Sequence, residues 1–321
     1  MRAVRVSDPA TVDVVKVPRP PAGTGEVLVR VSAAAVCPTD RRLAARGADP
    51  PRIPGHEAAG RLEDGTPVGV HPDIGCGRCP LCRAGWENRC PDRISIGLDR
   101  DGGFADWVAV PGRHVVPLAG VGPGVGPLLE PLACVLHALR LLGVGSRERI
   151  VVVGAGAMGI LATWALQAAG AAVAVVQRSE PRRRLAAELG ADAALGPDGD
   201  PAEALGDLPA AAIVAAPGAE ALTWALERVA PGGRVHAFAG TPEGAPVDAN
   251  LVHYRHLALV GSTGSTVADY ERARELAASG AVPLDRLPIA TVPLESVPGV
   301  LLGSPGSDVL KVLVDVEGAA M

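Results

Sequence analysis

The sequence predicts an α/β protein that combines a β-rich domain with a doubly wound parallel sheet, and three observations support this. The chain has 321 residues, more than one hydrophobic core usually accommodates, so two domains are expected. Its first third alternates apolar and polar residues in short runs separated by proline and glycine. From about residue 146, short apolar runs alternate with helical patterns, which is typical of βαβ units and a parallel sheet.

Short strands are expected in the N-terminal part at residues 2–6, 11–17, 26–35, 68–71 and 104–110. The second part is expected to contain six strands, at residues 150–153, 172–176, 193–195, 211–215, 234–239 and 257–261. Helices are expected between them at residues 157–169, 182–189, 219–230 and 267–279. From about residue 284 the chain returns to short strands, ending at 309–316, and this piece is too small to fold alone. We therefore predict domains at residues 1–122 and 123–283, with residues 284–321 adding to the N-terminal domain.

The composition is that of a globular protein and excludes some partners. Hydrophobic residues make up 48% and charged residues 20% of the chain, which suffices for an ample core. A net charge of −5 offers no electrostatic footprint for nucleic acid or an anionic membrane. Neither a signal-peptide core nor a transmembrane run is found, so a cytoplasmic location with reduced thiols is expected. Basic residues are nearly all arginine; lysine occurs only at Lys16 and Lys311, which we interpret as a compositional bias.

Four cysteines within fifteen residues suit one tetrahedral ion. They are Cys76, Cys79, Cys82 and Cys90. Two-residue gaps place three sulfurs about 2.3 Å from a common point, and the longer gap lets the chain return with the fourth. We interpret the group as a closed, structural zinc site, whose formal charge of 2 − 4 = −2 would be offset by Arg78, Arg83 and Arg89. The alternative is two disulfides, which nothing else in the chain favours.

A strand, a Gly-x-Gly-x-x-Gly turn and a helix start follow one another in the order a dinucleotide fold requires. The turn consists of Gly154, Ala155, Gly156, Ala157, Met158 and Gly159. Its first glycine permits the tight turn, its second admits a pyrophosphate to the backbone, and its third lets helix and strand approach. The pyrophosphate would bind at the helix N-terminus.

The end of the second strand indicates which dinucleotide is bound. NAD is usually held there by a carboxylate on the ribose 2′-OH, but this strand ends in Gln177, Arg178 and Ser179, with no carboxylate before Glu180. Arg178, with Ser179 and Arg182 nearby, suits a 2′-phosphate. We predict NADP in preference to NAD; the alternative is a solvated arginine, with Gln177 binding an unphosphorylated ribose.

A second possible metal group comes before the cysteine lobe. Cys37 and His56 both lie at ends of candidate strands, and one thiolate with one imidazole is half of a catalytic zinc shell. Either residue alone would be unconvincing, because a single buried cysteine or histidine is usually structural. They gain weight from the cysteine lobe and the dinucleotide turn in the same chain.

Over essentially its full length the sequence resembles a zinc-containing medium-chain dehydrogenase. The matching elements are Cys37-Pro-Thr39-Asp40, Gly55-His56-Glu57, the four-cysteine lobe, Glu130-Pro-Leu-Ala and the glycine turn. The resemblance implies a GroES-like catalytic domain, built from both chain ends, around an inserted Rossmann domain. It also implies two zinc ions per chain, one catalytic and one structural, and a homodimer or homotetramer.

Glu130 resembles the sorbitol and threonine dehydrogenase branch, where a glutamate takes the place of a second cysteine ligand. In relatives of this branch the glutamate after the histidine, here Glu57, binds zinc instead, and the sequence leaves both candidates open. Thr39 resembles the family's hydroxyl that passes the proton from the alcohol. Where several relatives continue the relay with histidine, this chain has Arg42, either an ordering or substrate-binding group or an exposed strand-end arginine.

The resemblance implies a zinc-dependent oxidoreductase that transfers hydride between a secondary alcohol and NADP or NAD. We expect the small-molecule substrate to be a polyol, sugar alcohol or cyclitol-like compound. An amino-alcohol or threonine-type dehydrogenase is the alternative enzyme. The alternative of another class is a non-catalytic NADP(H)-binding sensor, which would require a broken metal shell.

Overall fold

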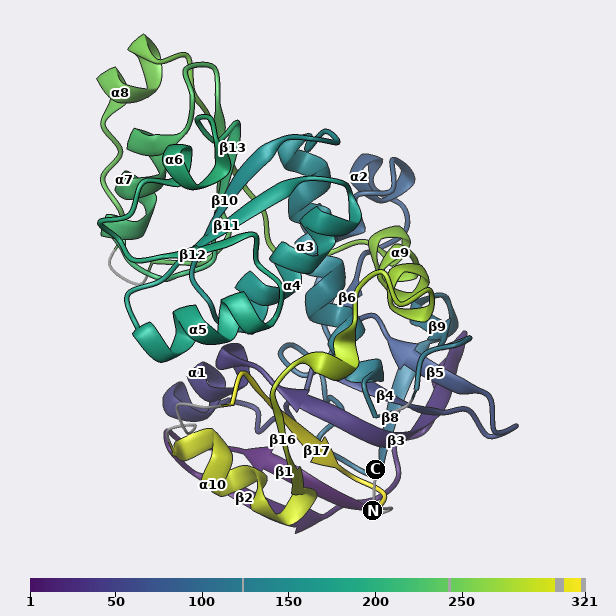
Figure 1. Cartoon of the computed structure of the whole chain (residues 1–321). Coiled ribbons are helices and arrows are strands. Elements are labelled where there is room, and N and C mark those ends of the chain that lie inside the picture. Colours follow the sequence, from purple (N-terminus) through teal and green to yellow (C-terminus); the bar gives the residue numbers. More distant parts are fainter. Residues whose placement is uncertain (123, 242–243, 304–308, 319–321) are drawn as a thin grey trace. The chain divides into compact units, whose positions relative to one another are not determined.

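The computed structural model describes residues 1–122, 124–241, 244–303 and 309–318. The chain forms two compact units (Figure 1). Unit 1 comprises Met1–Ala133, Gly264–Ser279 and Leu287–Met321, and unit 2 comprises Cys134–Thr263 and Gly280–Arg286. The predicted boundaries after residues 122 and 283 stay predictions. In the described part of the chain, no helix is long and apolar enough to cross a bilayer.

The main sheet of unit 1 joins both ends of the chain. Its strand order is β16-β17-β3-β4-β5-β9, and β8 pairs with the first half of β3. The strands are β3 (Glu26–Val36), β4 (Glu57–Arg61), β5 (Pro67–Val70), β8 (Trp107–Pro111), β9 (Val115–Pro117), β16 (Ile289–Pro293) and β17 (Lys311–Asp315). Because β17 pairs antiparallel with β3, Val312 lies opposite Val36. Strands from both ends of the chain thus belong to one sheet.

Smaller elements complete unit 1. The strand pairs are β1 (Arg2–Val6) with β2 (Val12–Lys16), and β6 (Asp73–Ile74) with β7 (Ile94–Ser95). The helices are α1 (Pro38–Arg46), α2 (Pro80–Arg83), α9 (Val267–Ala278) and α10 (Val297–Leu302). Short 3₁₀ turns are η1 (Glu87–Arg89), η2 (Gly112–His114), η3 (Gly126–Leu128) and η5 (Leu294–Ser296). The core is aliphatic apart from a few aromatic side chains such as Phe104, as the composition requires.

Unit 2 contains a six-stranded, fully parallel sheet in the order β12-β11-β10-β13-β14-β15. Its strands are β10 (Arg149–Val153), β11 (Ala172–Val176), β12 (Ala193–Leu195), β13 (Ala211–Val214), β14 (Arg234–Ala237) and β15 (Ala258–Gly261), which confirms the six predicted strands. The helices are α4 (Ala157–Ala168), α5 (Glu180–Glu188), α6 (Pro201–Leu205), α7 (Ala219–Arg228) and α8 (Ala249–Tyr254). Helix α3 (Leu129–Leu142) precedes the sheet, and η4 (Leu284–Arg286) follows β15 and α9 in the chain. The strand order reverses between β10 and β13, where doubly wound sheets bind their ligands.

A directional chain of hydrogen bonds runs through the interior of unit 1. Arg113 Nε donates to His114 Nε2 over 3.1 Å, and the Nδ1 atoms of His114 and His71 lie 3.1 Å apart. His71 Nε2 lies 3.1 Å from the carbonyl oxygen of Ser265. These contacts assign His114 as the Nδ1–H tautomer and His71 as the Nε2–H tautomer, so that each ring is neutral and donates once.

The hydrogen bonds through His114 and His71 predict that the folded protein loses stability in acid. Burial, with the nearby His71 and Arg113 charges, lowers the pKa of His114 from 6.5 to about 3. A depressed pKa in the folded state means that the unfolded chain binds the proton first, so stability falls as pH decreases from about 6.5 toward 3. We expect about 3 kcal/mol to be lost between pH 6.5 and 4, which thermal unfolding at several pH values measures.

The variant His114→Gln removes the titrating group, and His256→Gln serves as control because His256 is exposed. The difference in Tm between wild type and His114→Gln is expected to narrow as the pH falls to 4. Parallel Tm curves for the two proteins across this range would contradict the assignment.

Candidate active site

Three side chains with metal-ligand chemistry converge in unit 1, where the end of one central strand of the main sheet lies beside the start of the next. Cys37 directly follows β3, and His56 and Glu57 lie at the start of the neighbouring strand β4. Ala35 is paired with Glu57 across the two strands, which brings the end of β3 beside the start of β4. One ligand atom each from Cys37, His56 and Glu57 lies within 4.8 Å of the others. The site residues are thus brought together by strand register.

Asp40 orients this group, a role that the sequence analysis missed. It lies in the first turn of α1, is fully buried, and accepts the backbone N–H of Cys37 over 2.8 Å and of Gly55 over 3.2 Å. Its Oδ1 also lies 3.1 Å from His56 Nδ1. A carboxylate on Nδ1 fixes the imidazole so that Nε2 is left for a ligand. A carboxylate three residues after Cys37, with proline between them, was the available signal, because this is a helix-capping pattern.

The electrostatics of the group favour a cation. Burial lowers the pKa of His56, but the charges of Asp40 and Cys37 raise it by more, so that it lies well above 6.5. Asp40 and Cys37 thus make the surroundings of His56 favourable for positive charge. Sulfur, nitrogen and oxygen donors in this number match the three protein ligands of an open zinc site.

Lys311 is a second residue of this site that the sequence analysis missed. Its Nζ donates to Glu57 Oε1 over 2.6 Å, and the two side chains are only 5% and 2% exposed. Burial lowers the pKa of Lys311, but the charges of Glu57 and Cys37 raise it to a level above the ordinary value. The sequence analysis gave Lys311 no role, whereas the structure shows it as a buried, charged member of the site.

Glu130 is not part of the three-residue group. It is buried in the first turn of α3, and its charge contributes to the raised pKa values of Lys311 and Tyr270. Among the described residues, Cys37, His56 and Glu57 alone form the close ligand set at this site. The geometry thus favours Glu57 as the carboxylate ligand.

Thr39 and Arg42 both lie on α1, so the reading of Arg42 as a strand-end residue was wrong. Arg42 Nη2 donates to Thr39 Oγ1 over 2.8 Å. The threonine oxygen therefore accepts one hydrogen bond from a permanently charged group. Its hydroxyl hydrogen and second lone pair remain for a substrate.

The four cysteines of the lobe surround a common point. Their sulfur atoms lie within 4.8 Å of one another, with 4.0 Å between Cys76 and Cys82 and 3.8 Å between Cys79 and Cys90. Tetrahedral zinc with bonds of about 2.3 Å places sulfurs about 3.8 Å apart, whereas a disulfide requires about 2.0 Å. All four are free thiols, so the disulfide alternative is wrong for this structure.

Backbone hydrogen bonds prepare the lobe for anionic sulfur. The N–H groups of Cys76, Cys79 and Cys82 donate to lobe sulfurs over 3.3–3.4 Å. Hydrogen bonds from Arg78 and Cys79 lower the pKa of Cys76 to about 6, whereas burial raises the pKa of Cys82 to about 12. A metal ion is what would hold all four sulfurs deprotonated together.

The glycine turn of unit 2 has the geometry that the dinucleotide motif predicts. Gly154 has φ = +112°, and a Cβ on Gly159 would overlap the carbonyl oxygen of Gly154. Gly156 is the N-cap of α4 and faces open space, while no side chain caps the helix. Ala155 is buried beneath the turn, whereas Ala157 and Met158 form the half-buried first turn of α4. The free N–H groups of this first turn suit a pyrophosphate.

A cavity of about 540 Å³ lies at the carboxyl ends of β10, β11 and β13, and Gly154, Gln177 and Arg178 line it. Arg183 Nη1 donates to the carbonyl oxygens of Gln177 and Arg178, which fixes this loop. Arg178 itself forms no ion pair with the described residues and is exposed. Two further predicted residues lie nearby in sequence: Ser179 is the N-cap of α5, and Arg182 is half-buried in its first turn.

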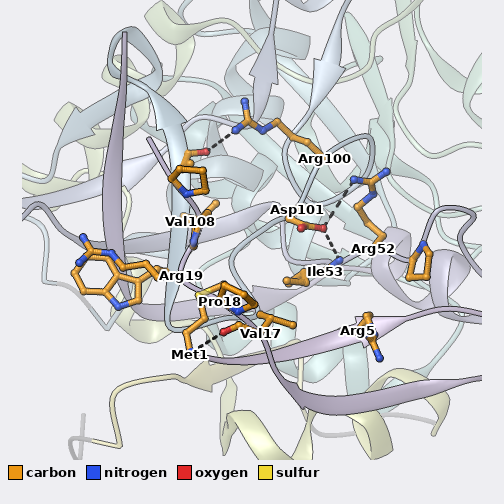
Figure 2. Close-up of a pocket in the computed structure, with 15 residues that line it drawn as sticks. Met1, Arg5, Val17, Pro18, Arg19, Arg52, Ile53, Arg100, Asp101 and Val108 are labelled. Atoms are coloured by element: carbon orange, nitrogen blue, oxygen red, sulfur yellow. Dashed lines mark hydrogen bonds and ion pairs between the residues drawn. The ribbon is translucent and has the colours of Figure 1, made fainter. Parts of the chain in front are cut away.

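Unit 1 contains another cavity, of about 690 Å³ (Figure 2). Figure 2 shows Arg52 beside Asp101, and Arg19 lies over the ring of Trp107 with 3.7 Å between the guanidinium carbon and the ring centre. Its lining contains no histidine, cysteine or hydroxyl side chain among the described residues. Its one carboxylate, Asp101, is paired with Arg52 among the described residues, so the lining brings together no set of catalytic or metal-ligating groups.

Comparison with known proteins agrees with the fold and the site. Residues 23–120 match the Alcohol dehydrogenase GroES-like domain, and residues 157–279 match the Zinc-binding dehydrogenase domain. L-galactonate-5-dehydrogenase of Escherichia coli is 30% identical, covering 84% of this chain and 86% of that one. L-threonine 3-dehydrogenase of Pyrococcus abyssi is 32% identical over 82% and 83% of the two chains. A Sinorhizobium meliloti protein described as a zinc-binding dehydrogenase, bound to NADP, superposes with a TM-score of 0.89 at 31% identity, covering 98% and 99%.

A GroES-like unit with a thiolate–imidazole–carboxylate group, joined to a dinucleotide-binding parallel sheet, defines a zinc- and nicotinamide-dependent oxidoreductase. The chain belongs to the family of zinc-containing medium-chain alcohol dehydrogenases. It is an enzyme that transfers a hydride between a small-molecule alcohol and a nicotinamide cofactor.

Proposed function

We propose that this enzyme oxidises a secondary hydroxyl group of a polyol, sugar alcohol or cyclitol-like compound, with NADP as the preferred cofactor. L-galactonate and L-threonine, named in the relatives, both carry secondary hydroxyl groups on small polar molecules. Few aromatic side chains are available to form a bulky apolar pocket. The observation that carries the proposal is the convergence of Cys37, His56 and Glu57 in a chain that also carries the dinucleotide turn.

We assign the chemistry as follows. Cys37, His56 and Glu57 would hold the catalytic zinc, which when bound supplies a Lewis acid that lowers the pKa of the substrate hydroxyl. Thr39 accepts or shares the proton of that hydroxyl through its free lone pair. Arg42 orients the Thr39 oxygen but cannot take the proton, because a guanidinium stays charged near neutral pH. The proton therefore leaves Thr39 toward water.

A substrate screen tests the proposal. Polyols, aminocyclitols and amino alcohols, L-threonine included, would each be supplied with NADP and NAD while absorbance of the reduced nicotinamide is followed. Turnover of secondary polyols is the expected result, and exclusive turnover of L-threonine or related amino alcohols would favour the alternative enzyme. The same preparation is expected to contain two zinc ions per chain and to behave as a homodimer or homotetramer in light scattering.

Arg178→Gln tests the cofactor preference. The guanidinium is expected to bind the 2′-phosphate by charge-assisted hydrogen bonds, so its loss should raise KM for NADP at least about tenfold, since such bonds contribute about 1.5–3 kcal/mol. KM for NAD should change less than about twofold. Arg184→Gln is the control, because Arg184 pairs with Glu180 over 2.7 Å instead. Equal changes in KM for both cofactors would refute the assignment.

A further inference from the structure

Lys311 is an unusual residue in this chain. Only two of the 30 basic residues are lysine, and the other, Lys16, is exposed. Lys311 begins β17, one residue before Val312, whose partner across the sheet is Val36. Since Cys37 follows Val36, the register places Lys311 beside the candidate ligands.

The two oxygens of Glu57 have different surroundings. Oε1 accepts from Lys311 Nζ over 2.6 Å, whereas Oε2 is buried and has no hydrogen-bond partner among the described residues. A buried carboxylate oxygen without a partner is costly, so its persistence calls for a ligand. Oε2 is therefore the atom of Glu57 that remains for a cation near Cys37 and His56.

A buried ammonium so close to a cation site acts against metal binding. It repels a divalent ion directly, and it competes with the ion for the carboxylate. A lysine that served only to stabilise the fold would have no reason to weaken this site.

We propose that Lys311 is a positioning residue that restricts Glu57 to one ligand oxygen, holding Oε1 so that a metal bound by Cys37 and His56 receives only Oε2. This inference rests on the proposed metal site. Its consequence is a metal held less tightly, and left more electron-poor, than the ligand set alone would give. Lys311 thus lowers the affinity of the site for the metal and raises the Lewis acidity of the bound metal.

Lys311→Met tests the proposal by zinc affinity, measured against a competing chelator. Loss of the ammonium is expected to tighten zinc binding by the Cys37, His56 and Glu57 group at least about tenfold, because a buried like charge is removed. Turnover should fall at the same time. Lys311→Arg, which keeps the charge, should stay within about threefold of wild-type affinity, and Lys16→Met, which removes an exposed lysine, should change nothing.

Cobalt substitution gives a readout that depends on Glu57. One metal per chain is exchanged for cobalt. The spectrum of Cys37→Ser, which keeps only the cysteine lobe as a metal site, is then subtracted to remove the contribution of the lobe. With Oε1 released in Lys311→Met, Glu57 can bind through both oxygens, so the visible bands should lose intensity as coordination expands. In the Glu57→Gln background, Lys311→Met should leave the spectrum unchanged.

The outcomes separate this inference from the proposed function. Weaker zinc binding in Lys311→Met, or a spectral change that persists without Glu57, would overturn the role of Lys311 and indicate a purely structural ion pair. If the wild-type enzyme oxidises no polyol, the proposed substrate class fails. The zinc and cobalt measurements still decide the role of Lys311, since neither uses an alcohol substrate.

Discussion

Replacing Cys37 with serine is expected to lower kcat/KM at least about 10³-fold while the protein stays folded. A hydroxyl is a much poorer zinc ligand than a thiolate, and a Lewis acid contributes several kcal/mol of transition-state stabilisation. Cys37 is half-buried and is not part of the hydrophobic core cluster of unit 1. Steady-state kinetics with the best alcohol, together with zinc analysis, measures the effect, and one zinc ion per chain should remain.

Cys134→Ser is the matched control for Cys37→Ser, because Cys134 is also half-buried but belongs to neither cysteine-containing group. It should retain activity within about threefold of wild type and both zinc ions, since Cys134 supplies no atom to either ligand group. Retained turnover in Cys37→Ser would mean that the metal, if bound, does not act through this residue. The dehydrogenase chemistry would then need another site in unit 1.

The strands and the ligand candidates were predictable because they depend on local patterns. Alternation and apolar runs located the six parallel strands, and short spacing located the cysteine lobe and the glycine turn. Helix α1 was also within reach, since Pro38 at its first position and Asp40 at its third are local capping signals. The sequence analysis instead placed the segment at the end of a candidate strand, whereas Cys37 is the N-cap of α1.

The environment of Glu57 was not predictable in the same way. Its partner Lys311 lies 254 residues further along the chain, and the two come together only because β17 and β4 both pair with β3. No periodicity reports a single long-range ion pair, and the rarity of lysine in this chain suggested composition rather than selection. For Glu130 a local motif was present but was not sufficient. The motif made Glu130 a candidate zinc ligand beside Glu57, and the three-dimensional arrangement favours Glu57.

The variant Cys79→Ser is expected to lower Tm by about 10 °C, in contrast to Cys37→Ser. Cys79 caps α2 by accepting the N–H of Cys82 over 3.4 Å, and four residues cannot form a stable helix without such support. Loss of metal from the lobe couples directly to folding. If about 3 kcal/mol is lost from unit 1, a cooperative unit of roughly 150–250 residues, it unfolds about 6–12 °C lower, which differential scanning calorimetry measures.

The effect should extend beyond the lobe, because other parts of unit 1 are hydrogen-bonded to it. Glu87 in η1 accepts the N–H of Val267 over 2.7 Å at the start of α9, and Arg113 donates to the carbonyl oxygen of Gly75 over 2.8 Å. Hydrogen exchange should therefore accelerate in the first turn of α9 as well as in residues 75–93. Cys37→Ser protein, which keeps only the lobe ion, should fall in Tm on treatment with a strong chelator by about as much as Cys79→Ser falls below wild type, since both changes remove the lobe ion. A lobe that keeps its Tm after complete zinc removal would show that hydrogen bonds alone hold it, and the structural role of the metal would be refuted.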